Sequence, residues 1–116
     1  MKELPEQMRR YLPDSEFRVA AWRSGELLIE VEKEIGPEKG IAKFFGVSFV
    51  NLPVTMTVYS MEVKSPEELP SDFWNASTPD RRDLDADDLV FVIESSWGGR
   101  QFVIAKSLAY EVVQSA

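Results

Sequence analysis

The sequence contains no cysteine and no histidine among its 116 residues. Without cysteine, the chain forms neither a structural disulfide nor a thiolate zinc site. Without histidine, it lacks imidazole metal ligands, the base of Ser-His and Cys-His nucleophile pairs, and the side chain best suited to proton transfer near neutral pH. These absences favour a protein that is not an enzyme and that uses no metal or cofactor.

Long apolar runs and an excess of positive charge are missing as well. No stretch approaches the 18 apolar residues of a membrane span, and residues 1–5 lack the pattern of a secretory signal, so we expect a cytoplasmic protein. The chain has 20 acidic and 13 basic side chains, a net charge of -7. Such a surface repels phosphate groups, which disfavours binding to nucleic acid or to anionic membranes. Residues 61–116 carry most of the excess, with 11 acidic and 5 basic side chains.

Hydrophobic residues make up 44% of the chain, enough to build a core in a single domain over residues 1–116. Leu4, Met8 and Leu12 recur at helical spacing and Pro13 follows, which predicts a short helix over 4–12. Strand-like patterns occupy most of the remaining chain, and 108–113 reads as a strand or a short helix. The predicted strands are 17–23, 26–34, 41–50, 54–64, 89–96 and 101–106.

Two short turns predict hairpins and therefore antiparallel strands. A turn at Ser24-Gly25 opposes Trp22 to Leu27 and puts both, with Ala20, on the core side. A turn at Gly98-Gly99 opposes Ser95 to Phe102 and Ile93 to Ile104. We predict a mainly β (or α+β) fold, an antiparallel barrel-like or two-layer sheet of six to seven strands with a short N-terminal helix.

Residues 65–88 do not fit the strand pattern. Ser65-Pro66-Glu67-Glu68 is typical of a helix start, and Pro70 limits that helix to about one turn. The rest is a long, irregular connection, which is uncommon in compact domains unless it is functional or disordered. Asp83, Asp85, Asp87 and Glu94 match the spacing of a calcium loop, but position 6 is Asp88 rather than glycine and a strand follows directly. A solvated acidic turn is the favoured interpretation, with no metal bound.

Three aromatic residues are candidates for a binding surface. Phe73 and Trp74 lie in the irregular segment, either as anchors for a partner or as plugs over the sheet. Trp97 is either a contact at a hairpin tip or the cross-strand partner of Arg100.

The combination of acids and aromatics in residues 65–88 favours a non-enzymatic protein-interaction or accessory module that binds a basic protein. The alternative is a small-ligand-binding protein with an apolar pocket, in which Phe73 and Trp74 form a lid. The candidate binding residues are Phe73, Trp74, Asp80, Asp83, Asp85, Asp87 and Trp97.

A hairpin followed by Phe44-Phe45-Gly46-Val47 and Leu52-Pro53 is similar to small bacterial β-rich proteins of unknown role, some of them immunity proteins to toxins. The resemblance implies a β-rich fold and assigns no role to any residue.

Overall fold

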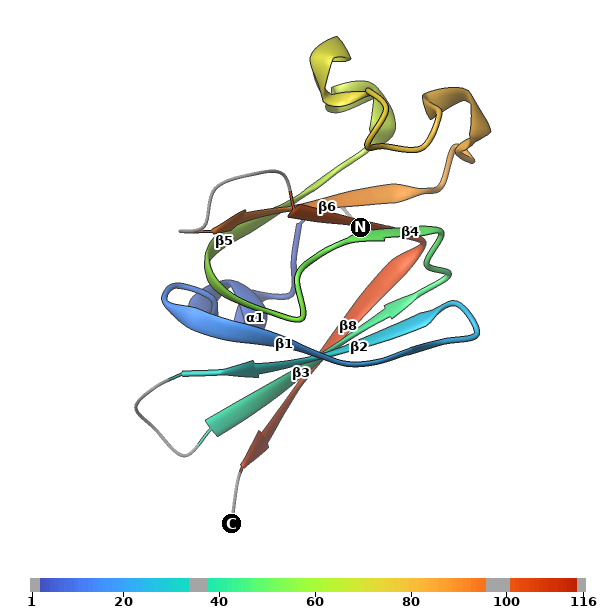
Figure 1. Cartoon of the computed structure of the whole chain (residues 1–116). Helices are drawn as coiled ribbons and strands as arrows, with labels where there is room; N and C mark the ends of the chain where they lie inside the picture. The colour runs from blue at the N-terminus through green and yellow to red at the C-terminus, as the bar shows by residue number, and fades with distance from the viewer. Residues whose placement is uncertain (1–2, 34–37, 96–100, 115–116) are drawn as a thin grey trace.

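A computed structural model describes residues 3–33, 38–95 and 101–114, and it confirms a mainly β fold (Figure 1). One helix, α1 (Glu6–Tyr11), precedes the strands. The strands are β1 (Ser15–Arg23), β2 (Glu26–Glu32), β3 (Glu38–Phe45), β4 (Phe49–Asn51), β5 (Thr55–Lys64), β6 (Leu89–Ser95), β7 (Gln101–Ala105) and β8 (Ser107–Gln114). In the described residues no helix is long and apolar enough to cross a membrane.

The eight strands form one antiparallel sheet in the order β4-β7-β6-β5-β1-β2-β3-β8. The count is slightly higher than the predicted six to seven because the predicted strand 41–50 is divided into two strands and the segment after β7 is a strand as well. β3 continues into β4, and β7 continues into β8. The sheet coils but does not close, so that β4 and β8 form its two edges.

The predicted single strand over 41–50 is wrong, because the chain turns at Gly46. Gly46 has a φ of +63°, a conformation that glycine adopts without strain and most other residues avoid. β3 ends just before it at Phe45, and β4 begins at Phe49. The apolar composition of the run reflects burial in β3 and partial burial in β4 rather than one continuous strand.

The first hairpin has the predicted pairing, with Trp22 opposite Leu27, but Trp22 and Ala20 do not lie in the core. The register shifts between Val19 and Ala21, so Ala20 is an extra residue on β1. The shift turns Phe17 and Val19 toward the core, where a regular strand would have placed Ala20. Trp22 lies at the end of the hairpin and is 56% exposed.

The predicted register of β6 and β7 is also wrong. Ile93 pairs with Gln101 and Val90 with Ile104, which is three residues away from the pairing that a turn at Gly98-Gly99 implies. That turn lies outside the described residues. The segment after β7, for which helix and strand were both open, forms β8.

Both faces of β6 and β7 are covered. Their inward-facing residues join the main core between the sheet and α1, where Phe44 and Phe91 meet edge to face with ring centroids 5.1 Å apart. Their outward-facing residues Val90, Phe102 and Ile104 are completely buried in a second, smaller cluster. Residues 65–88 supply the cover for that cluster, and Figure 1 shows them on the outer side of β6, away from α1.

Candidate functional site

The 65–88 segment begins with the predicted helix-start motif, which forms a single 3-10 turn, η1 (Pro66–Glu68). The Ser65 backbone N–H and hydroxyl donate to Glu68 Oε1 at 3.0 and 2.9 Å. The same backbone bond lowers the pKa of Glu68 from its ordinary value. Pro70 follows in an extended conformation, so the turn goes no further. The departure of the segment from β5 is therefore fixed by local hydrogen bonds.

A row of aromatic rings fixes the middle of the segment to the sheet. Phe73, at the end of η2 (Ser71–Phe73), is only 6% exposed and meets Phe102 of β7 with ring centroids 5.1 Å apart. Phe102 stacks on Phe49 of β4, and Trp74 packs against Phe73 on the other side at 5.0 Å. Phe73 is thus inside the second cluster, while Trp74 is only partly buried.

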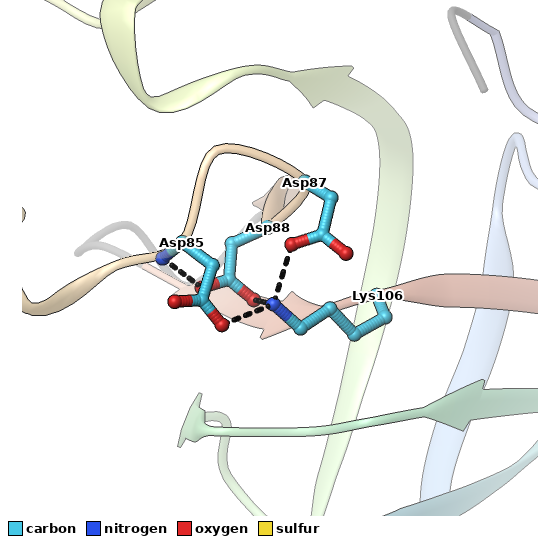
Figure 2. Close-up of polar contacts among 4 residues, drawn as sticks. All are labelled: Asp85, Asp87, Asp88 and Lys106. Carbon is cyan, nitrogen blue, oxygen red and sulfur yellow. Dashed lines mark hydrogen bonds and ion pairs between the residues drawn. The ribbon is translucent and has the colours of Figure 1, made fainter.

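Lys106 holds the far end of the segment. It lies between β7 and β8, and its ammonium group donates to Asp85 Oδ2 at 2.8 Å and to Asp87 Oδ1 at 2.7 Å (Figure 2). Asp88 Oδ1 completes the arrangement as an ion pair 3.0 Å from Nζ, without the geometry of a hydrogen bond. The hydrogen bonds to Asp85 and Asp87 raise the pKa of Lys106, and the Lys106 bond lowers the pKa of Asp87.

Asp88 is the buried member of this arrangement, 4% exposed. Its Oδ2 accepts a 2.8 Å hydrogen bond from the Asp85 backbone N–H, and its own backbone N–H donates to the Asp85 carbonyl. These bonds close a tight turn immediately before β6. Asp88 therefore orients the two exposed aspartates toward Lys106, and we call Asp85, Asp87, Asp88 and Lys106 the lysine clamp.

Gly46 provides the space that the clamp needs. A Cβ atom on Gly46 would lie 2.5 Å from Lys106 Cγ, so the aliphatic part of Lys106 packs directly on the glycine. The backbone is joined at the same place, because Lys106 N–H donates to the Phe45 carbonyl at 2.8 Å. The bend of β3 into β4 and the attachment of the 65–88 segment thus share one point.

Asp80 and Asp83 lie on a third turn, η3 (Arg81–Asp83). Asp80 caps this turn by accepting from the Arg82 backbone, and it also binds the Arg82 side chain at 2.8 and 3.1 Å. The bond to the Arg82 side chain lowers the pKa of Asp80 to about 2. Asp83 is exposed and forms no salt bridge with another described residue. It differs in this from Asp80, Asp85 and Asp87, each of which has a cationic partner.

The calcium spacing does not produce a cation cage. Asp85 and Asp87 face Lys106, and β6 carries Glu94 away to accept from the Ser60 hydroxyl at 3.0 Å. Within residues 3–33, 38–95 and 101–114, no group of three or more acidic side chains could hold a metal ion. Trp97, the last candidate, lies outside the described residues.

No known protein family, curated protein or solved structure matches the chain. Four of the better-defined pockets on the described residues are open to solvent, and none of these four is lined by Trp22, Phe45 or Trp74.

The sequence analysis did not identify Lys106 or Gly46 as part of this site. Gly46 appeared inside an apolar run, and 59 residues separate it from Lys106 along the chain. One signal was available: Lys106 is the only charged residue in the apolar stretch from Phe102 to Tyr110. A lysine in such a stretch needs either solvent or an acidic partner. The sequence alone does not choose that partner, because Glu94 and Glu111 lie nearer to Lys106 along the chain than the aspartates of the 65–88 segment.

Proposed function

We propose that this protein is a non-catalytic interaction module and that it binds a basic protein partner through the outer side of residues 65–88. The observation that carries the proposal is that this segment, although it contains no strand, is fixed in place at its beginning, middle and end. The Ser65 turn, the Phe73 ring and the lysine clamp supply those three attachments.

A fixed conformation favours binding because ordering a flexible loop at an interface costs free energy. The attachments here use inward-facing groups, namely Phe73 and Asp88, and leave the outward-facing carboxylates accessible. The role of Phe73 in this proposal is to position the segment. Trp74, which is partly exposed next to it, is the aromatic residue available to a partner.

The charge of the segment supports a basic partner. Residues 65–88 hold eight acidic and two basic side chains. Lys106, Arg81 and Arg82 compensate only part of this charge, so a negative field remains on the outer side of β6. Charge complementarity of this kind raises the association rate and excludes acidic partners.

The test compares affinity capture from the native cell extract by three forms of the full chain, the wild type and two variants. Asp83→Lys reverses an exposed charge inside the segment, and Glu16→Lys makes the same change on β1, outside it. We expect Asp83→Lys to lose a protein that the wild type and Glu16→Lys both retain. Equal recovery by all three, or equal loss from both variants, would overturn the proposal.

Trp74→Ala separates a binding residue from a structural one. If Trp74 contacts the partner, the variant loses the captured protein while its free energy of unfolding falls by clearly less than the ~3–5 kcal/mol typical of removing a buried aromatic ring. Strong destabilisation with capture unchanged contradicts the proposal. The small-ligand alternative predicts instead that capture depends on neither Asp83 nor Trp74.

A further inference from the structure

We propose that β8 is the contact surface of a homodimer, in which the β8 strands of two copies pair antiparallel and join their sheets edge to edge. β8 runs over eight residues, Ser107–Gln114, and of the described strands it pairs only with β3. The other edge strand, β4, has only three residues. An edge strand leaves a row of backbone N–H and C=O groups without a partner in the sheet, and these groups can pair with another strand.

The edge lacks the features by which proteins usually prevent such pairing. β8 contains no proline and no lysine, its register with β3 is regular throughout, and Glu111 is its only charged residue. Its outward-facing side chains are small or apolar around that glutamate, with Ala109 exposed and Val113 37% exposed. Long, regular edges with little charge are the ones that associate.

The charge distribution allows this edge to pair with a second copy despite the net charge of -7. Residues 1–60, which include β3, hold 8 basic and 9 acidic side chains and are nearly neutral. The acidic 65–88 segment lies at the end of the molecule opposite to the C-terminal end of β8 (Figure 1). Two copies joined through β8 therefore keep their acidic segments apart.

A register centred on Tyr110 satisfies the side chains on both faces. In a two-fold antiparallel pair, facing residues lie on the same side of the sheet, so their numbers must share parity. Pairing residues 107–113 about Tyr110 puts Leu108 opposite Val112 of the second copy and Ala109 opposite Glu111. Pairing about Glu111 would oppose two glutamates, which destabilises a sheet.

The chosen register also gives Glu111 a cation. Lys43 lies directly opposite Ala109 on β3, and both Lys43 and Glu111 are exposed. Neither side chain forms a salt bridge or a hydrogen bond with another described residue. In the dimer, Glu111 of one copy and Lys43 of the other lie on either side of Ala109, with backbones about 10 Å apart. Their long side chains meet over the alanine methyl group, twice in each dimer.

Sedimentation velocity of the full chain tests the dimer. We expect the mass of the wild type to rise from 13.2 kDa toward twice that value between about 10 µM and about 1 mM, as expected of a small interface. A wild-type protein that stays at 13.2 kDa over this whole range overturns the proposal.

Three variants identify the surface. Glu111→Lys should weaken dimerisation at least tenfold, and adding Lys43→Glu to it should restore the wild-type behaviour, because the exchange recreates both ion pairs. Glu67→Lys, with the same change of charge on the distant segment, should dimerise at least as well as the wild type. A dimer insensitive to Glu111→Lys, or one that the exchange does not restore, overturns the inference.

Ala109→Glu keeps the experiment informative if Glu111→Lys folds poorly. The introduced carboxylate would face Lys43 within the same copy, which suits the monomer, and it would face Glu111 of the second copy, which opposes the dimer. We expect a monomeric variant with an undiminished melting temperature. Normal dimerisation of this variant contradicts the register.

Discussion

Replacing Gly46 by alanine measures how closely the Lys106 side chain packs on the bend between β3 and β4. Gly46 and Gly25 both have positive φ angles, +63° and +77°. Around Gly25 an added Cβ would meet nothing within 4 Å, whereas at Gly46 it would meet Lys106 Cγ at 2.5 Å and Lys106 Cβ at 3.0 Å. The two substitutions therefore share the backbone cost and differ in the collision with Lys106.

The expected magnitudes follow from that difference. An alanine at positive φ costs about 1 kcal/mol, after allowing for the smaller conformational entropy of the unfolded chain. Gly25→Ala should show only this loss. At Gly46 the collision adds about 1–3 kcal/mol, the usual range for overpacking, which brings the total to roughly 2–4 kcal/mol. Urea denaturation of both variants, followed by tryptophan fluorescence, gives the two free energies of unfolding.

A double-mutant cycle tests the stated cause. In a Lys106→Ala background the 2.5 Å contact is gone and the 3.0 Å contact with Cβ remains. The excess cost of Gly46→Ala over Gly25→Ala should therefore shrink but not vanish. Equal costs for the two glycines in the wild-type background, or an excess unchanged by Lys106→Ala, would refute the reasoning.

Three further changes have defined outcomes. Phe73→Ala removes a side chain that is only 6% exposed, so it should lower the free energy of unfolding by about 3–5 kcal/mol in a urea titration. The control Val54→Ala, at a 71%-exposed position, should change it by less than ~0.5 kcal/mol. A small effect at Phe73 contradicts its anchoring role. The lowered pKa of Asp87 contributes stability that is complete above the unfolded pKa of about 3.9 and is lost as pH falls through the folded value, so Lys106→Met should flatten the acid limb of melting temperature against pH. Burial raises the pKa of Tyr110 to about 12, so stability should fall from pH 10 to about 12 as the unfolded phenol ionises, and Tyr110→Phe should remove the latest step of a tyrosinate absorbance titration.

The parts of the fold that the sequence predicted are those fixed by neighbouring residues. The Ser24-Gly25 turn correctly opposes Trp22 to Leu27, because the geometry of a two-residue turn sets the nearest pairs. The Ser65 turn is likewise closed by groups within three residues of one another. Local chemistry was sufficient in both places.

The errors arose where distant residues decide the geometry. Nothing in the sequence around Ala20 predicts the β-bulge that turns Phe17 into the core. Gly46 lies in a run so apolar that burial and a continuous strand give the same pattern. β6 and β7 are apolar on both faces, so a slip of register changes no hydrophobic match, and the observed pairing could not be derived from alternation. The lysine clamp depends on contacts between residues about 20 positions apart that no periodicity records.

The positions of Lys64 and Val90 bear on how the 65–88 segment can be engineered. These residues face each other across β5 and β6, so the segment leaves and re-enters the sheet at adjacent points. A short turn could connect the two strands, which makes the segment an insertion in a hairpin by topology. Removing it would nevertheless uncover Phe102 and Ile104, which are completely buried beneath it. A shortened chain would therefore expose a hydrophobic patch that promotes association with other molecules. Any sequence that replaces the segment must place an aromatic residue at the position of Phe73.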